Sequence, residues 1–192
     1  ALLVGCGLGR DPQTQRLVRR LIRESDIPIV IDADGLNALI DHTDILTDHA
    51  EGRVILTPHA GEFNRLADPT VDLTDRIRVA VDYAQRWNSI LLLKGLPGIA
   101  ASPDGRAFVN TTGGPGLASA GTGDVLAGFC AGLAAQGLEP LRAAAAALRI
   151  GGAAADTYAR KYSEQSLMAT DVIRQLPEVL HTRFSPSRTP HA

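Results

Sequence analysis

Residues 110–124 combine two chemical capabilities in one segment, Asn110-Thr-Thr-Gly-Gly-Pro-Gly-Leu-Ala-Ser-Ala-Gly-Thr-Gly-Asp124. The segment is rich in glycine and small hydroxyl residues, and it leads directly into an apolar stretch that begins at Val125. Gly121 and Gly123 would expose backbone N–H groups at a helix start, where such donors lack intrahelical partners and the helix dipole adds positive potential. The segment therefore indicates a phosphate-binding site, because glycine allows a close backbone approach that a Cβ would obstruct.

Asp124 ends this segment, at a position where its negative charge would repel a bound anion. Its carboxylate can cap the following helix, or it can accept a proton from a group held next to the phosphate. A phosphate site with an adjacent base is the minimum apparatus for phosphoryl transfer. We therefore predict that Asp124 is a catalytic base.

Four further groups of small or polar residues each follow an apolar segment. They are Gly5–Gly9, Asp32–Asn37, Thr57–Glu62 and Lys94–Gly98. Continuous aliphatic segments that alternate with helical ones are typical of an α/β fold with a mostly parallel central sheet and helices on both faces. Ligands of such sheets bind beyond the carboxyl ends of the strands. We therefore expect these groups, together with Asn110, to line one rim of the sheet.

The elements that must position this rim follow from periodicity and from turn residues. We expect strands at 2–4, 27–31, 54–56 and 90–93, then a hairpin of 99–102 and 107–110 around Pro103-Asp104-Gly105. Helices are expected at 12–24, 35–40, 61–66, 73–87, 125–136, 141–158 and 169–176, the last stopped by Pro177. The expected domain covers 1–182, and 183–192 are expected to form a disordered tail.

Several rim residues have a structural as well as a functional interpretation. His59 can be structural, merely exposed, or a substrate contact. Glu62 can cap the next helix, or bind a ligand or a water on Mg²⁺. Lys94 is one of only two lysines, and it can pair with a nucleotide phosphate or extend from the strand end into solvent.

The remaining rim residues divide between turn geometry and contacts. We expect Asp34 to cap the short helix after it, which leaves Asp32 and Asn37 to orient a substrate or a cation. The segment 5–9 lacks the sixth-position glycine of the dinucleotide fingerprint, because position 10 is arginine. A tight turn near the substrate, centred on Gly7, accounts for these glycines.

Composition excludes several classes of protein. The chain has 192 residues, 45% hydrophobic and 21% charged, which suits one globular domain. Its formal charge of −2 and the lack of a basic cluster argue against nucleic-acid binding, and we see no membrane span or leader. Cys6 and Cys130 are expected to be reduced, packed thiols of a cytoplasmic protein, and no protein metal ligands are predicted.

These segments, in this order, resemble the ADP/ATP-dependent NAD(P)H-hydrate dehydratases, which are nicotinamide-nucleotide repair enzymes of the ribokinase-like superfamily. The matching segments are Gly5-Cys-Gly-Leu-Gly9, Ile31-Asp-Ala-Asp-Gly-Leu-Asn-Ala-Leu39, Leu56-Thr-Pro-His-Ala-Gly-Glu62, Leu93-Lys-Gly95, residues 110–128 and Ser166-Leu-Met-Ala-Thr-Asp-Val172. Gly-x-Gly-Asp is shared by many kinases of the superfamily, whereas residues 57–62 together with the long loop are more specific. Family members have strands and a helix before the first glycine-rich turn, so the resemblance implies an N-terminally truncated domain.

The resemblance also implies the reaction, a nucleoside-phosphate-dependent dehydration of hydrated NADH or NADPH with Mg²⁺ present. It implies substrate contacts from Gly7, His59 and Asp124. The implied ADP or ATP contacts are Lys94, Gly95, Leu96, Pro97, Gly98, Gly121 and Gly123, with Asp32, Asn37, Glu62 and Asn110 in support. We further expect a homo-oligomer, for which a tetramer is one candidate. A small-molecule kinase acting on a vitamin precursor and a non-catalytic nucleotide-binding module stay open as alternatives.

Overall fold

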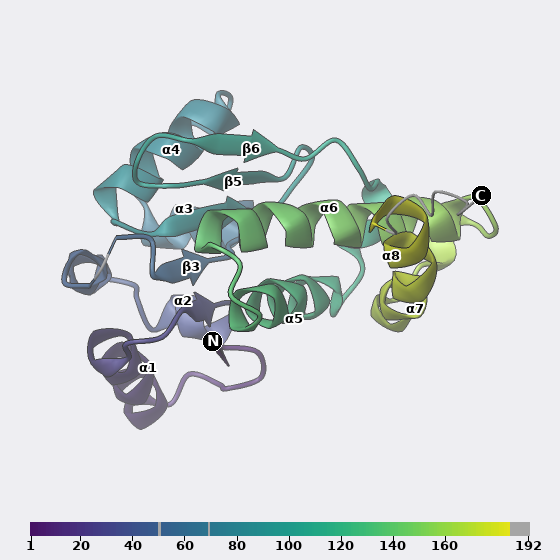
Figure 1. Cartoon of the computed structure of the whole chain (residues 1–192). Coiled ribbons are helices and arrows are strands. Elements are labelled where there is room, and N and C mark those ends of the chain that lie inside the picture. Colours follow the sequence, from purple (N-terminus) through teal and green to yellow (C-terminus); the bar gives the residue numbers. More distant parts are fainter. Residues whose placement is uncertain (50, 69, 185–192) are drawn as a thin grey trace, which may run out of the picture.

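A single six-stranded sheet forms the centre of the computed structural model, which describes residues 1–49, 51–68 and 70–184. The strands lie in chain order across the sheet (Figure 1). They are β1 (Leu2–Val4), β2 (Ile29–Ile31), β3 (Val54–Leu56), β4 (Ile90–Leu93), β5 (Ile99–Ala101) and β6 (Ala107–Val109). The first four are mutually parallel, and β4, β5 and β6 are joined by antiparallel pairing. The predicted mostly parallel sheet and its terminal hairpin are confirmed.

Helices cover both faces of this sheet, as predicted. One face packs against α1 (Pro12–Glu24), α2 (Asp34–Asn37), α3 (Ala60–Leu66) and α4 (Arg76–Arg86). The other face packs against α5 (Thr122–Ala135) and α6 (Pro140–Ala159). Three short 3₁₀ helices complete the connections at Thr43–Thr47, Pro115–Ala118 and Glu164–Ser166.

The continuous aliphatic strands are explained by these two layers. Ile29 and Ile31 of β2 face the core formed with α1 to α4, whereas Val30 between them faces α5 and α6. All three side chains are fully buried. Successive strand residues point to opposite faces, so a strand with helices on both sides needs an apolar residue at every position.

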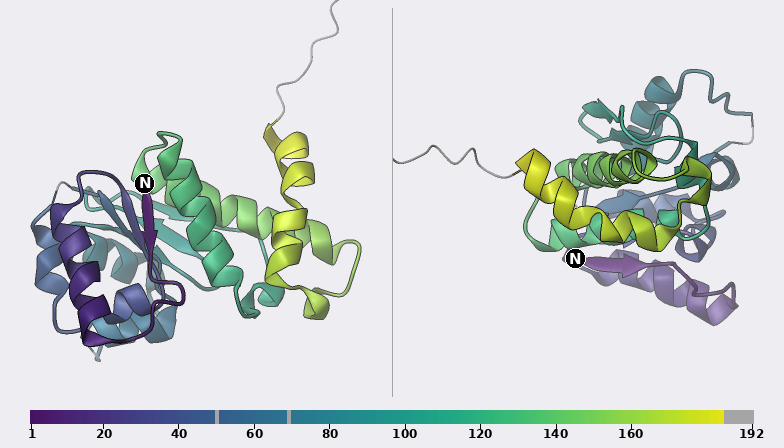
Figure 2. Two further views of the ribbon diagram at one scale, coloured as in Figure 1. Left: turned by 90° about the horizontal axis from the view of Figure 1, so that it is seen from below. Right: turned by 90° about the vertical axis from the view of Figure 1, so that its right-hand side faces the viewer.

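Two further helices lie beyond the end of the sheet, against α6. They are α7 (Ala169–Arg174) and α8 (Leu176–Phe184), and Figure 2 shows them as one arm at the end of α6 away from β1. Their buried residues Val172 and Val179 pack with Ala153–Ala155 of α6. A helix of 20 residues is therefore shared between the sheet and this arm.

The prediction that Pro177 stops the last helix is wrong. Helix α7 ends at Arg174, and α8 begins at Leu176 with Pro177 as its second residue. Proline is tolerated in a first helical turn, because the N–H that it lacks would have no intrahelical partner there. The expected tail begins inside α8 at residue 183, and its part from 185 to 192 lies outside the described residues.

Other boundaries differ by a few residues. Helix α5 begins at Thr122 rather than at 125, which places Asp124 inside its first turn. Helix α4 begins at Arg76 rather than at 73, after the Asp75 carboxylate accepts a hydrogen bond from the Arg78 N–H. Within the described ranges, none of the helices combines the length and hydropathy that a membrane crossing needs.

Candidate active site

The carboxyl ends of the parallel strands meet at one rim because their hydrogen bonding continues beyond the strands. The Asp32 N–H donates to the Val4 carbonyl at 3.1 Å, and the Thr57 N–H donates to the Ile31 carbonyl at 3.1 Å. The Lys94 N–H donates to the Pro58 carbonyl at 2.8 Å, which pairs Lys94 with His59 as a parallel bridge. The structure therefore brings the segments that follow β1 to β4 together, as the sequence indicates.

The first turn of α5 lies over this rim with no side-chain cap. Its N-cap is Gly121, in the left-handed region at φ 84°, and the Thr122 N–H is used by the Ser119 carbonyl at 3.3 Å. The following residues, Gly123 and Asp124, occupy the second and third helical positions. Since Gly121 is the N-cap, Asp124 does not cap the helix, and its exposed carboxylate is available for chemistry.

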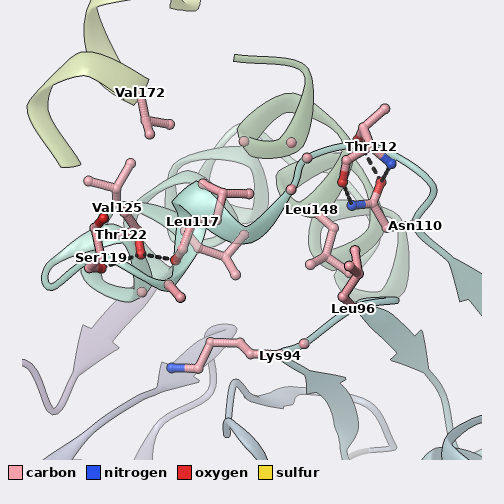
Figure 3. Close-up of a pocket in the computed structure, with 18 of the residues that line it drawn as sticks. Lys94, Leu96, Asn110, Thr112, Leu117, Ser119, Thr122, Val125, Leu148 and Val172 are labelled. Atoms are coloured by element: carbon pink, nitrogen blue, oxygen red, sulfur yellow. Dashed lines mark hydrogen bonds between the residues drawn. The ribbon is translucent and has the colours of Figure 1, made fainter. Parts of the chain in front are cut away.

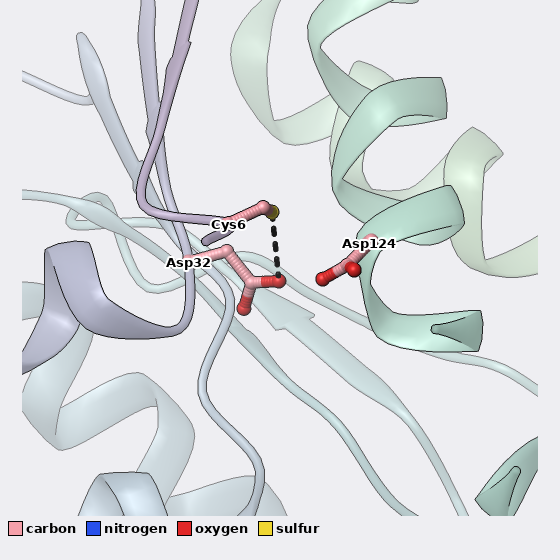
Figure 4. Close-up of side chains that lie close together, drawn as sticks. All are labelled: Cys6, Asp32 and Asp124. Atoms are coloured by element: carbon pink, nitrogen blue, oxygen red, sulfur yellow. Dashed lines mark hydrogen bonds between the residues drawn. The ribbon is translucent and has the colours of Figure 1, made fainter. Parts of the chain in front are cut away.

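Asp124 faces two other side chains from separate elements. Its carboxylate, an Asp32 oxygen and the Cys6 sulfur all lie within 4.8 Å of one another (Figure 4). The Cys6 thiol points at the Asp32 Oδ2, with 3.9 Å between sulfur and oxygen. Asp32 is 1% exposed, and Cys6 is half-buried.

Sequence reasoning did not assign Cys6 to the site. Burial is the largest cause that raises the pKa of its thiol to about 12, followed by hydrogen bonding to Asp124 and by the charges of Asp32 and Asp124. The only available signal was its place in a turn directly after a strand of the parallel sheet. Such a thiol stays protonated at neutral pH and can donate to the carboxylates beside it.

We expect Cys6 to react slowly with alkylating reagents in spite of its partial exposure. The thiolate is the reactive form, and the raised pKa keeps it scarce until the pH approaches 12. At pH 8, iodoacetamide should modify Cys6 at least about tenfold more slowly than a cysteine peptide, by peptide-mapping mass spectrometry. Cys130 is the internal reference for an unreactive thiol, because it is buried and burial also raises its pKa to about 12. A Cys6 rate equal to that of the free peptide would contradict this environment.

His59 and Glu62 form a reciprocal cap at the start of α3. The His59 Nδ1 accepts from the N–H groups of Gly61 at 3.0 Å and Glu62 at 3.2 Å. The Glu62 Oε2 accepts a hydrogen bond from the backbone N–H of His59 at 2.9 Å. Because Nδ1 is an acceptor here, a neutral imidazole has its proton on Nε2 and can donate it. Glu62 therefore does cap the helix, and His59 presents a donor on a side chain that is 55% exposed.

Asp34 does not have the capping role predicted for it. The N-cap of α2 is Ala33, so Asp34 lies inside the first turn. Its carboxylate reaches back to accept from the Gly9 N–H at 3.0 Å and from the Asn37 side chain at 3.1 Å. The helix begins one residue earlier than expected, so the Asp34 carboxylate binds the 5–9 turn and Asn37 supports it.

Asn110 stabilises the start of the long loop. Its side-chain nitrogen donates to the Thr112 carbonyl at 2.8 Å, and its Oδ1 accepts from the Thr112 hydroxyl at 2.8 Å. Its backbone N–H donates to the Gly98 carbonyl at 2.8 Å. A single residue therefore holds the loop over the segment 94–98.

A cavity of about 470 Å³ lies between this loop, α5, α6 and α7. Figure 3 shows Lys94 at its base and Val172 on the opposite side. Six of the predicted site residues line it, namely His59, Lys94, Gly95, Leu96, Asn110 and Gly123. Apolar side chains of Leu117, Val125, Leu126, Phe129, Leu148 and Val172 form much of its wall. This size and this mostly apolar lining are typical of small-molecule sites.

The other predicted residues lie around the cavity rather than on its wall. Asp124 and Asp32 are next to Gly123, where an added Cβ would lie 4.0 Å from the Asp32 Oδ2. Gly98 is buried behind the wall, where a Cβ would lie 2.8 Å from a Leu148 methyl carbon. Gly7 is exposed, with φ 71° and open space around it. The first turn of α5 therefore lies between the cavity and the carboxylates of Asp32 and Asp124.

Comparison with known proteins assigns this architecture. A family model described as NAD(P)H-hydrate dehydratase matches residues 1–178. The bifunctional NAD(P)H-hydrate repair enzyme of Salinibacter ruber is 54% identical over 188 residues, which are 98% of this chain and 35% of that protein. The chain thus spans about a third of the length of that relative.

Solved structures agree with the family match. The ADP/ATP-dependent NAD(P)H-hydrate dehydratase from Bacillus subtilis, co-crystallised with ATP and Mg²⁺, is 31% identical with a TM-score of 0.81. The match covers 94% of this chain and 63% of that one. A ribokinase-like superfamily protein from Enterococcus faecalis is 25% identical, with a TM-score of 0.74 and coverage of 94% and 63%. The predicted ribokinase-like fold is confirmed, and the chain belongs to the NAD(P)H-hydrate dehydratase family.

Proposed function

We propose that the protein containing this chain dehydrates hydrated NADH or NADPH, using ADP or ATP as the phosphoryl donor. The observation that best supports the proposal is the first turn of α5. It has no side-chain cap and it presents Asp124. It also lies between the cavity and the carboxylates of Asp32 and Asp124. Family membership supports the choice of substrate.

The proposed chemistry converts a poor leaving group into a good one. Asp124 takes the proton of the ring hydroxyl, and the hydroxyl oxygen attacks the terminal phosphate of the nucleotide. The bond between that phosphate and the rest of the nucleotide breaks, and the nucleotide leaves one phosphate shorter. Backbone N–H groups near Gly121 and Gly123 stabilise the charge that develops on the phosphate oxygens. The C–O bond then breaks as the ring nitrogen donates its electron pair, and phosphate leaves with the oxygen. The neighbouring ring carbon finally loses a proton, which restores the ring double bond and the reduced nicotinamide.

The cavity is the proposed site of the adenine nucleotide. Lys94, Gly95 and Leu96 line it on one side, with Pro97 and Gly98 following them in the chain, and the apolar side chains of the wall suit a planar base. The side on which Asp124 and Gly7 lie, outside the cavity wall, is then left for the nicotinamide substrate, next to His59, which lines the cavity. Because the His59 Nδ1 accepts hydrogen bonds at the start of α3, its Nε2–H would be the group that donates a hydrogen bond to this substrate.

The Mg²⁺ that accompanies a nucleoside phosphate fits the residues present. Mg²⁺ prefers oxygen donors and keeps several waters, and carboxylate oxygens of Asp32 and Asp124 lie beside the first turn of α5. The Cys6 sulfur in the same group is not a donor that Mg²⁺ prefers. Bound there, the ion would neutralise negative charge on the phosphates.

We also propose that the protein is a cytoplasmic homo-oligomer whose dehydratase domain includes this chain through residue 182. Free thiols at Cys6 and Cys130 suit a reducing compartment. Exposed apolar side chains on the α7 and α8 arm, Ile173 and Leu180, suit contact with another subunit. Light scattering of the full-length protein measures the number of subunits directly.

Turnover of hydrated NADH tests the proposed reaction. The full-length protein with Mg²⁺ and either ADP or ATP should release free phosphate as the near-ultraviolet absorbance of reduced nicotinamide returns. A stable phosphorylated product from a vitamin precursor, with no return of that absorbance, would instead favour the small-molecule kinase. Nucleotide binding without turnover of either substrate would favour a non-catalytic module.

A further inference from the structure

The Lys94 ammonium is paired with carboxylates of the protein itself. Its Nζ lies 2.8 Å from the Asp32 Oδ1 and 3.5 Å from the Glu62 Oε2. The Lys94 side chain is 16% exposed, Asp32 1% and Glu62 9%. The pair with Asp32 is therefore a largely buried ion pair, and its two members come from strand ends 62 residues apart.

This ion pair lies directly beneath the first turn of α5. A Cβ built on Gly123 would be 3.3 Å from the Lys94 Nζ and 4.0 Å from the Asp32 Oδ2. Asp32 uses one oxygen for Lys94, while its other oxygen faces Cys6 and Asp124. Lys94 thus contacts the carboxylate that neighbours the proposed base.

Charge balance among the protein's own side chains favours a cation at this place. Asp32, Glu62 and Asp124 would otherwise collect three negative charges around a turn that is proposed to bind phosphate. Within the described part of the chain, the charged groups nearest the Lys94 side chain are the carboxylates of Asp32 and Glu62, and His59 and Asp124 lie next to those two. A second cation, the Arg76 guanidinium, donates to the Lys94 backbone carbonyl at 3.0 Å. A largely buried carboxylate that loses the lysine paired with it is left uncompensated by the protein at considerable cost.

We propose that Lys94 is a positioning residue, which acts on the reaction through Asp32 rather than by holding the nucleotide phosphate itself. It neutralises Asp32 beneath Gly123 and thereby fixes the carboxylate against which Asp124 and the first turn of α5 are placed. Lys94 then borders the nucleotide cavity with its backbone, while its ammonium belongs to the protein's own network. This inference rests on the proposed function for the identity of the reaction.

Variants that remove one charge or both charges of the Lys94–Asp32 pair distinguish a positioning role of Lys94 from a direct contact with the nucleotide phosphate. In the full-length protein, Lys94→Met should lower kcat by about 100-fold, the effect of a misplacement near 1 Å at a reacting centre. It should also weaken ADP binding about tenfold, since unbalanced carboxylates repel phosphate. Lys94→Met combined with Asp32→Asn removes both charges, and we expect it to recover ADP affinity and at least about tenfold of the lost kcat.

A direct phosphate contact predicts a different pattern. The double variant would then bind ADP as weakly as Lys94→Met does, and its kcat would be no higher, which would overturn the proposal. Turnover is compared per folded molecule, with circular dichroism confirming the fold, so that simple loss of stability does not mimic the effect. Asp32→Asn alone serves as a second single variant where Lys94→Met does not fold.

The matched control is Lys161→Met, which removes the other lysine and its exposed pair with Glu178 and should leave kcat unchanged. ADP affinity, measured by calorimetry, distinguishes this inference from the proposed function. If the wild-type protein binds ADP but does not turn over hydrated NADH, the proposed function fails, and recovery of ADP binding in the double variant still decides the role of Lys94.

Discussion

Asp124→Asn is expected to lower kcat for hydrated NADH by about 1000-fold while the protein stays folded. General-base catalysis contributes factors of this order, and the amide has no basic oxygen to accept the hydroxyl proton. Asp124 is exposed, is not the helix cap, and occupies the third position of α5, so its loss removes no capping bond. Steady-state turnover in the full-length protein measures the effect, and thermal unfolding checks the fold.

Measurement of nucleotide binding distinguishes the loss of a catalytic base from general damage to the site. The affinity for ADP, measured without Mg²⁺, should be retained or slightly increased in Asp124→Asn, because a negative charge next to the phosphates is removed. Asp82→Asn is the matched control, since Asp82 lies on α4 in an exposed pair with Arg78 and should change neither quantity. Unchanged turnover by Asp124→Asn would remove Asp124 from the role of base.

The sheet and its rim could be predicted because their signals are local. Each parallel strand is an uninterrupted aliphatic run such as Val54–Leu56, followed at once by glycine or polar residues. The topology of parallel strands then brings those residues to one edge, whatever the details of packing. His59 and Lys94, which follow β3 and β4, meet at the cavity for this reason.

What the sequence missed depends on contacts between distant segments. Nothing near Lys94 in sequence indicates that Asp32, 62 residues earlier, is its partner. Cys6 resembles any packed thiol until its position against Asp32 and Asp124 is known. Aspartate is a common helix-capping residue, so Asp34 is a reasonable candidate. Because the helix starts one residue earlier, the Asp34 carboxylate instead accepts a hydrogen bond from the Gly9 N–H.

Pro177 illustrates a different limit. A proline ends a helix or begins one, and the choice depends on whether the chain behind it can pack. Here Val179 is buried against α6, so a new helix begins at Leu176 instead of a tail. Local propensity was ambiguous, and tertiary burial decided the outcome.

Gly5→Ala is expected to be the most destabilising single methyl addition at the rim, by more than about 4 kcal/mol. Gly5 is buried with φ 139°, and a Cβ there would lie 1.7 Å from the Asp32 carbonyl oxygen and 2.9 Å from the Gly35 nitrogen. Both neighbours are backbone atoms, so neither can rotate away. The end of β1 and the start of α2 would have to separate.

Gly9→Ala is the matched control, because it isolates conformational strain from collision. Gly9 lies in the same turn at φ 72°, but a Cβ there has nothing within 4 Å. Its cost should be limited to the left-handed backbone, about 1–2 kcal/mol. Urea unfolding of the two variants measures the difference, and equal free energies of unfolding would show that the Gly5 contact relaxes freely. A large difference would mean that the approach of Gly5 to Asp32, which sets Cys6 beside the carboxylates, is fixed by a glycine that no other residue can replace.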